Sequence, residues 1–249
     1  MLQPRKSGRA LLEEIDGTLW PTPVLWWLGR NAFIFRFATI TFYIDPHGAA
    51  PLDPAQVRHA DLILSTDGHL DAPAVSAMLE ASKQAKLVLP KSAEAEAHAA
   101  GIAYHRMTTT NADLRIEFFK DGLYGRVYAL PSARPSLDWS PDQGYPHLGY
   151  LIRFGRWTVY HPGDCVLYDT LADRLRPFNV SVALLPVGGQ NFSVAQAAQL
   201  AADIGASWIV PMHAGASQEN DFIAHMLGHR PEQPFKVFQP GEKWTVPEE

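Results

Sequence analysis

The sequence contains a single cysteine, Cys165, among 249 residues. One cysteine excludes an intramolecular disulfide and any zinc site built from several thiolates. Cys165 directly follows Asp164, but a cysteine nucleophile also needs a base and an orienting group within reach, so we interpret it as a small buried residue. Because a chain without disulfides is typical of a reducing compartment, we expect a cytoplasmic location.

Long apolar runs and long basic runs are also missing. No stretch of about 18 apolar residues occurs, so we expect no membrane span. Residues 1–20 lack the apolar core of a signal peptide. The net charge of −5 disfavours a nucleic-acid groove. Neither the G-x-S-x-G motif of serine hydrolases nor a phosphate-binding P-loop motif is present. These absences disfavour a membrane or a nucleic acid as a partner.

What the sequence has is a large apolar fraction, 47%, arranged in short segments that indicate a sizeable core. Aromatic and β-branched segments at residues 24–29, 32–37 and 39–46 predict strands, and a helical pattern follows at 72–85. The second half repeats the order of strands followed by strand–helix alternation. The sequence therefore predicts one α/β domain over residues 1–249, with 1–20 as an N-terminal extension and two mixed sheets covered by helices.

Three polar clusters stand where predicted strands end. Asp67, His69 and Asp71 form the first cluster, Asp164 follows a second strand, and His213 follows a third. Loops at strand ends can bring side chains together on a rigid scaffold, and histidine and aspartate are good ligands for zinc or similar ions. The alternative is that the aspartates cap helices and form turns while the histidines are scattered by chance.

The order of these clusters resembles that of the metallo-β-lactamase superfamily. Its motif T-H-x-H-x-D-H aligns with residues 66–72, Thr-Asp-Gly-His-Leu-Asp-Ala, and its later G-D and P-x-H elements align with residues 163–164 and 211–213. The segments LWWLG and YHPGD resemble the branch of L-ascorbate-6-phosphate lactonases. The resemblance implies a four-layer αβ/βα sandwich of two mixed β-sheets flanked by helices, with a site at one edge. At that edge, an ion would activate a water molecule. The water would attack a small-molecule substrate that contains an ester, lactone or phosphate group.

The same resemblance implies a set of site residues. His69, Asp71 and His213 would be metal ligands, Asp164 would ligate or bridge, and Asp67 would be a variant ligand at the place of a motif histidine. Asp71 would also be the catalytic residue that takes a proton from the attacking water. One divalent ion is expected, namely zinc, manganese or iron.

Three departures from the motif open a second interpretation. Asp67 and Ala72 replace motif histidines, and Arg134 falls near the place of another ligand. Ala72 offers no donor and an arginine is a permanent cation, so a second ion is not expected. Alternatively, Asp67 and Arg134 pair with each other where an ion would lie. The chain would then be a metal-free or non-catalytic descendant of the fold that serves as a binding or scaffold protein.

Further residues are candidates for substrate contact. Arg134 and Trp139 lie in the Pro- and Ser-rich loop at residues 131–147, and His161 precedes Pro-Gly-Asp. Together with Arg30, Arg134 can attract an anionic substrate such as a phosphorylated sugar lactone. Trp139 can equally anchor its loop. His161 can fix the orientation of a ligand residue from behind the site, or it can be a strand-end residue with a solvated ring. His147 in the same loop is a candidate replacement ligand. The sequence does not predict an oligomeric state.

Overall fold

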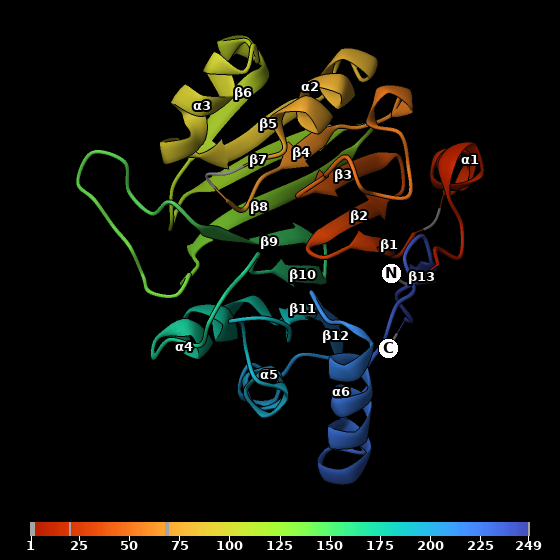
Figure 1. Ribbon diagram of the computed structural model, residues 1–249, viewed down its shortest axis with the longest axis vertical. Coiled ribbons are helices and arrows are strands. Elements are labelled where there is room, and N and C mark those ends of the chain that lie inside the picture. Colours follow the sequence, from red (N-terminus) through yellow and green to blue (C-terminus); the bar gives the residue numbers. More distant parts are fainter. Residues whose placement is uncertain (1–2, 20, 68–69, 249) are drawn as a thin grey trace.

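The computed structural model describes residues 3–19, 21–67 and 70–248. Apolar strands form two mixed sheets that pack face to face (Figure 1). The first sheet has the order β13-β1-β2-β3-β4-β5-β6. Its strands are β1 (Val24–Gly29), β2 (Ala32–Phe37), β3 (Ile40–Ile44), β4 (Leu62–Leu64), β5 (Lys86–Pro90), β6 (Met107–Thr110) and β13 (Lys243–Thr245).

The second sheet has the order β12-β11-β10-β9-β8-β7. Its strands are β7 (Arg115–Lys120), β8 (Leu123–Pro131), β9 (Leu148–Phe154), β10 (Trp157–His161), β11 (Val182–Pro186) and β12 (Trp208–Met212). Strands β7 to β10 are joined as antiparallel neighbours, whereas β10, β11 and β12 run parallel. The central strands are buried on both faces because each sheet lies between its partner and a layer of helices.

Helices cover the outer face of each sheet (Figure 1). They are α1 (Gly8–Gly17), α2 (Ala72–Ala81), α3 (Glu94–Ala99), α4 (Leu171–Leu175), α5 (Val194–Asp203) and α6 (Ala216–His229). One apolar cluster fills the space between the sheets, a second joins α1, α2 and α3 to the first sheet, and a third joins α4, α5 and α6 to the second sheet. This architecture confirms the predicted four-layer αβ/βα sandwich.

The N-terminal segment contributes to this core. Leu11, Leu12 and Ile15 on α1 are buried in the same cluster as Trp26 and Ile34 of the first sheet. The apolar face of α1 thus ties most of the predicted N-terminal extension, residues 1–20, to the domain. Within the described part of the chain, none of the helices combines the length and apolar character that a bilayer crossing requires.

The register of the parallel strands determines where the polar loops meet. Ile44 pairs with Leu64, so the residues that follow β3 and β4 emerge side by side. In the second sheet, Pro186 pairs with Met212, and β10 precedes them in the same parallel group. Ligands bind outside the carboxyl ends of such strands in open α/β sheets. The Tyr150 hydroxyl of β9 donates to Ser65 O at 2.7 Å and ties the two sheets together at this edge.

Candidate active site

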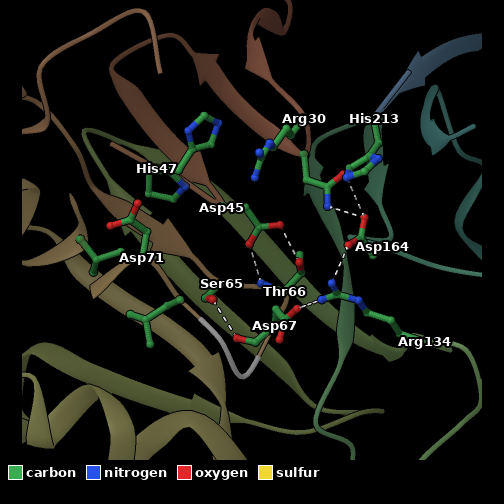
Figure 2. Close-up of a pocket in the computed structure, with 14 residues that line it drawn as sticks. Arg30, Asp45, His47, Ser65, Thr66, Asp67, Asp71, Arg134, Asp164 and His213 are labelled. Carbon is green, nitrogen blue, oxygen red and sulfur yellow. Dashed lines mark hydrogen bonds and ion pairs between the residues drawn. The ribbon is translucent and has the colours of Figure 1, made fainter. Parts of the chain in front are cut away.

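A pocket of about 340 Å³ opens at this edge between the two sheets (Figure 2). Loops after β1, β3, β4, β8, β10 and β12 contribute to its wall. Its lining residues are Arg30, Asn31, Asp45, Pro46, His47, Ser65, Thr66, Asp67, Leu70, Asp71, Val75, Arg134, Asp164 and His213. The structure thus brings five of the predicted site residues, Asp67, Asp71, Arg134, Asp164 and His213, to one pocket.

Asp164 contacts residues from several segments of the chain. Asn31 Nδ2 donates to Asp164 Oδ1 at 2.8 Å, and His213 Nε2 lies 3.6 Å from the same oxygen. The Ser132 hydroxyl donates to the Asp164 carbonyl oxygen at 2.9 Å. These contacts come from loops after β1, β8 and β12, so Asp164 joins three separate segments of the chain.

Arg134 lies between Asp67 and Asp164. Its Nη1 donates to Asp67 Oδ2, and its Nη2 lies 3.1 Å from Asp164 Oδ2 (Figure 2). His147 Nδ1 lies 3.5 Å from Asp67 Oδ1 but is buried without a hydrogen bond. Burial and the nearby Arg134 charge lower the pKa of His147, so its ring is neutral beside the carboxylate. The pairing of Asp67 with Arg134 is the feature that the second interpretation of the sequence required.

Asp71 is held by backbone amides. It is the N-cap of α2, with Oδ1 accepting from Ala74 N at 3.1 Å and Oδ2 accepting from Gly48 N at 2.9 Å. Such bonds satisfy otherwise unpaired donors at a helix N-terminus. Among the described residues, Asp71 makes no hydrogen bond or ion pair with Asp164 or His213. Its contacts are those of a capping residue, and its catalytic role stays a prediction.

The described donors do not fit a metal ion as they are arranged. In residues 3–19, 21–67 and 70–248, no group of three or more His, Cys, Asp or Glu side chains is placed to hold an ion. The carboxylates of Asp67 and Asp164 both form ion pairs with Arg134, whose permanent positive charge repels a metal cation. His69, the remaining predicted ligand, lies outside the described residues.

Asp45 sits at the base of the pocket and holds the loop that carries Asp67. Its Oδ1 accepts from Thr66 N at 2.7 Å and its Oδ2 accepts from Thr66 Oγ1 at 2.5 Å. Loss of hydration raises the pKa of Asp45 to about 6, partly countered by the two bonds from Thr66. Gly163 allows this packing, because a Cβ atom there would lie 2.5 Å from Thr66 Oγ1.

His161 is a buried residue that holds other residues of the site, which agrees with one of its two interpretations from the sequence. Its ring is fully buried, Nε2 lies 2.7 Å from Asn31 O, and Nδ1 accepts from Gly163 N at 3.1 Å. Burial lowers the pKa of His161 to about 4, so the ring is neutral. Because the ring has no exposed edge, the alternative of a solvated ring is wrong, and substrate contact by His161 stays a prediction. His161 fixes the segments that bear Asn31 and Asp164.

Trp139 lies on the surface of the loop at residues 131–147. Its side chain is exposed, and it is not among the residues that line the pocket. In this arrangement the indole does not cover the site, so substrate contact by Trp139 stays a prediction. Arg134, from the same loop, does reach the pocket.

Arg30 and His47 form the opposite wall. Figure 2 shows the Arg30 guanidinium directed toward the space between His47 and Asp45. Among the described residues, Arg30 has no ion pair, in contrast to Arg134. Burial is the main cause that lowers the pKa of His47, and the Arg30 charge adds to it. The pocket therefore has one arginine bound to carboxylates and one that faces the cavity.

Sequence reasoning missed two residues of this site. Asn31 was not among the predicted site residues, yet it holds Asp164. Asp45 was not predicted to belong to the site, although it follows β3 just as Asp67 follows β4. The signal for both was present: each is a polar residue directly after a buried strand on the same edge as the recognised clusters.

The fold is that of a metallo-β-lactamase-type αβ/βα sandwich. It has two mixed sheets with helices on their outer faces, and a polar site lies at the strand-end edge that the sheets share. The Beta-lactamase superfamily domain matches residues 24–213, which is most of the chain, and the chain belongs to this family. A UPF0173 metal-dependent hydrolase of Myxococcus xanthus is 31% identical over 78% of this chain and 71% of its own. A protein of the same name from Pyrobaculum calidifontis is 28% identical over 75% of this chain and 82% of its own.

The solved structures agree on the fold. A metallo hydrolase from Ignicoccus hospitalis superposes with a TM-score of 0.69 at 21% identity, covering 92% of this chain and all of the other. At this identity the likeness concerns the architecture alone. The predicted membership of the metallo-β-lactamase superfamily is confirmed, whereas the roles of the individual site residues stay predictions.

Proposed function

We propose that this chain is a hydrolase that acts on a small anionic ester, lactone or phosphate-containing molecule in the pocket between Arg30 and Arg134. Relatives that share much of its length are named metal-dependent hydrolases, which supports the reaction class. The observation that supports a negatively charged substrate is the position of the Arg30 guanidinium. It faces the cavity and has no ion-pair partner among the described residues.

Arg30 is the feature of the pocket wall that supports an anionic ligand. Asp67 and Asp164 share the single positive charge of Arg134, and Asp71 is bound to backbone amides. Asp45, whose pKa is raised to about 6, is hydrogen bonded to Thr66. Arg30 is a cation in the pocket wall that has no ion-pair partner among the described residues. A guanidinium binds carboxylate and phosphate oxygens through two parallel hydrogen bonds.

His213 is the residue that we assign to proton transfer. It lines the pocket, and its Nε2 lies 3.6 Å from Asp164 Oδ1. A carboxylate beside an imidazole orients the ring, and such contacts are often long in the absence of substrate. His213 would take a proton from the attacking water while Arg30 holds the anionic group. The relatives' names imply a divalent ion, but the described donors do not fit one, so no step is assigned to it.

A substrate panel tests this proposal. Phosphorylated lactones, phosphate esters and carboxylate-bearing esters are compared with neutral analogues, without added metal and with zinc, manganese or iron(II). We expect kcat/KM to favour the anionic members by at least about tenfold, an effect of about 1.4 kcal/mol. Arg30→Ala should remove this preference through KM, and His213→Gln should lower kcat.

Arg9→Ala is the matched control, because Arg9 is an exposed arginine on α1 that pairs with Glu13. This variant should leave both kinetic constants unchanged. Absence of turnover for every member of the panel under all metal conditions, with folded protein, would overturn the hydrolase proposal.

The ion pairs of Arg134 favour a second candidate, a metal-free protein that binds an anionic ligand without converting it. One result distinguishes the two candidates. If a panel member binds saturably, if Arg30→Ala weakens that binding and if no product forms, the protein binds the ligand without converting it.

A further inference from the structure

We propose that Arg134 takes the place of a metal ion, so that the positive charge between Asp67 and Asp164 is part of the protein chain. Relatives of this chain are named metal-dependent hydrolases, yet its described donors are not arranged to hold an ion. A side chain in the place of the ion is compatible both with hydrolysis of a ligand in the pocket and with binding alone.

The guanidinium bridges the two carboxylates as a shared cation would. Nη1 donates to Asp67 Oδ2, and Nη2 lies 3.1 Å from Asp164 Oδ2. Two terminal nitrogens of one planar group thus contact two carboxylates from different sheets. Arginine cannot lose its proton in a protein, so the bridging charge is permanent. A divalent ion would have to displace it to reach the same oxygens.

The remaining carboxylate oxygens are turned toward other residues. Asp164 Oδ1 accepts from Asn31 Nδ2 at 2.8 Å and lies near His213 Nε2, and Asp67 Oδ1 faces His147 Nδ1 at 3.5 Å. The Asp164 oxygens therefore have protein donors on both sides. Ligands of a metal ion instead direct free lone pairs at a common point, with zinc at about 2.0–2.2 Å from each oxygen or nitrogen.

The backbone around Arg134 is fastened to the backbone around Asp164. Val166 N donates to Ala133 O at 2.9 Å, and the Ser132 hydroxyl donates to Asp164 O at 2.9 Å. Both bonds flank the two charged residues, so the loop after β8 is anchored where its arginine reaches the carboxylate. The placement of the guanidinium is thus supported by the fold and not only by the ion pairs.

Removing the guanidinium should convert the site into a metal site. Arg134→Ser would leave Asp67, Asp164, His147 and His213 around the vacated space, a donor set of the kind that zinc prefers. His147 Nδ1 is buried without a hydrogen bond, which makes it available as a ligand. The wild-type chain should not bind zinc there, and the variant should.

Metal content by mass spectrometry and zinc titration calorimetry test this, on protein purified without a histidine tag. The background carries His225→Ala and His229→Ala, because these stacked rings on α6 are a potential zinc site elsewhere. We expect substoichiometric metal and no zinc-induced rise in Tm for this chain. Adding Arg134→Ser should give about one zinc per chain and an affinity at least about tenfold higher.

Two results would overturn the proposal. One is stoichiometric metal in the chain that retains Arg134, lost again in Asp164→Ala. The other is no zinc uptake by the Arg134→Ser variant with a circular dichroism spectrum like that of the parent. If the variant does not fold, the metal content of the chain with Arg134 still decides between the two accounts.

Discussion

The pocket has two sides, and the charged groups on each side have different binding partners. On the Arg134 side, consisting of Asp67, Arg134 and Asp164, the cation is bound to two carboxylates. On the Arg30 side, consisting of Arg30, His47 and Asp71, backbone amides bind the carboxylate and the cation faces the cavity. Two arginines in one pocket therefore have different roles. The first belongs to the structure of the site, and the second is available to a ligand.

The largest expected effect comes from Gly163, which lies beneath the Arg134 side. Its φ is +69°, and a Cβ atom would press on Thr66, whose hydroxyl holds Asp45. Gly163→Ala should lower the free energy of unfolding by about 3 kcal/mol through backbone strain and collision. Chemical denaturation measures this loss.

Gly189→Ala is the matched control for that collision. Gly189 has nearly the same φ, +66°, but open space around the position of a Cβ atom. This variant should lose only about 1 kcal/mol from strain. Equal losses in the two variants would show that close packing under the Arg134 side is not important.

The pH dependence of stability separates the two buried groups beneath that side. The pKa of His161 is about 4 against 6.5 unfolded, so the folded state binds fewer protons in this range and His161 costs stability as the pH falls from 6.5 to 4. The pKa of Asp45 is about 6 against 3.8 unfolded, so its contribution increases as the pH falls through 6. The two effects oppose each other in the wild type.

Single variants should reveal each effect. Relative to the wild type, His161→Gln should gain about 3 kcal/mol on acidification from pH 6.5 to 4, at 1.36 kcal/mol per unit of pKa shift. Asp45→Asn should lose stability over the same range relative to the wild type. Urea unfolding at several pH values provides the data, and parallel curves for all three proteins would refute these assignments.

The two arginines should differ in ligand binding. Arg30→Ala should weaken binding of inorganic phosphate by about tenfold, because it removes the cation that faces the cavity. Arg9→Ala is again the control. Calorimetric or NMR titration measures the affinities, and an unchanged affinity in Arg30→Ala would remove the distinction between the two sides.

The smallest expected effects are the losses in free energy of unfolding when either arginine of the pocket is replaced. Arg134→Ala leaves Asp67 and Asp164 without their shared cation, but the arginine side chain is 45% exposed, so we expect a loss of only about 1 kcal/mol. Arg30→Ala should change stability by less than about 0.5 kcal/mol. A double-mutant cycle of Arg134→Ala with Asp164→Asn isolates the pair, and a coupling energy of zero would contradict the bridge.

Much of the architecture was predictable because hydrophobic periodicity and turn residues report local structure. The strands at residues 24–29 and 32–37 and the helix start at residue 72 agree with the sequence pattern. Helix α1 was not predicted, because it lies in a charged segment with few large apolar residues. Leu11, Leu12 and Ile15 are the ones that are buried. Their burial depends on the first sheet, which is a tertiary effect.

The site was predictable to the extent that its residues follow strands in a recognisable order. The motif order placed Asp67, Asp164 and His213 at one edge, and the pairing of Asp67 with Arg134 was one of two stated alternatives. The burial of His161 and the bond from Asn31 to Asp164 were not accessible, because both depend on the packing of β1 against β10 across the two sheets.

Anomalous scattering from wild-type crystals grown with zinc tests most directly whether the protein supplies its own cation. This account predicts continuous density for the Arg134 guanidinium against both carboxylates and no anomalous peak between them. A strong peak coordinated by Asp67 and Asp164, with Arg134 turned out to solvent, would contradict it.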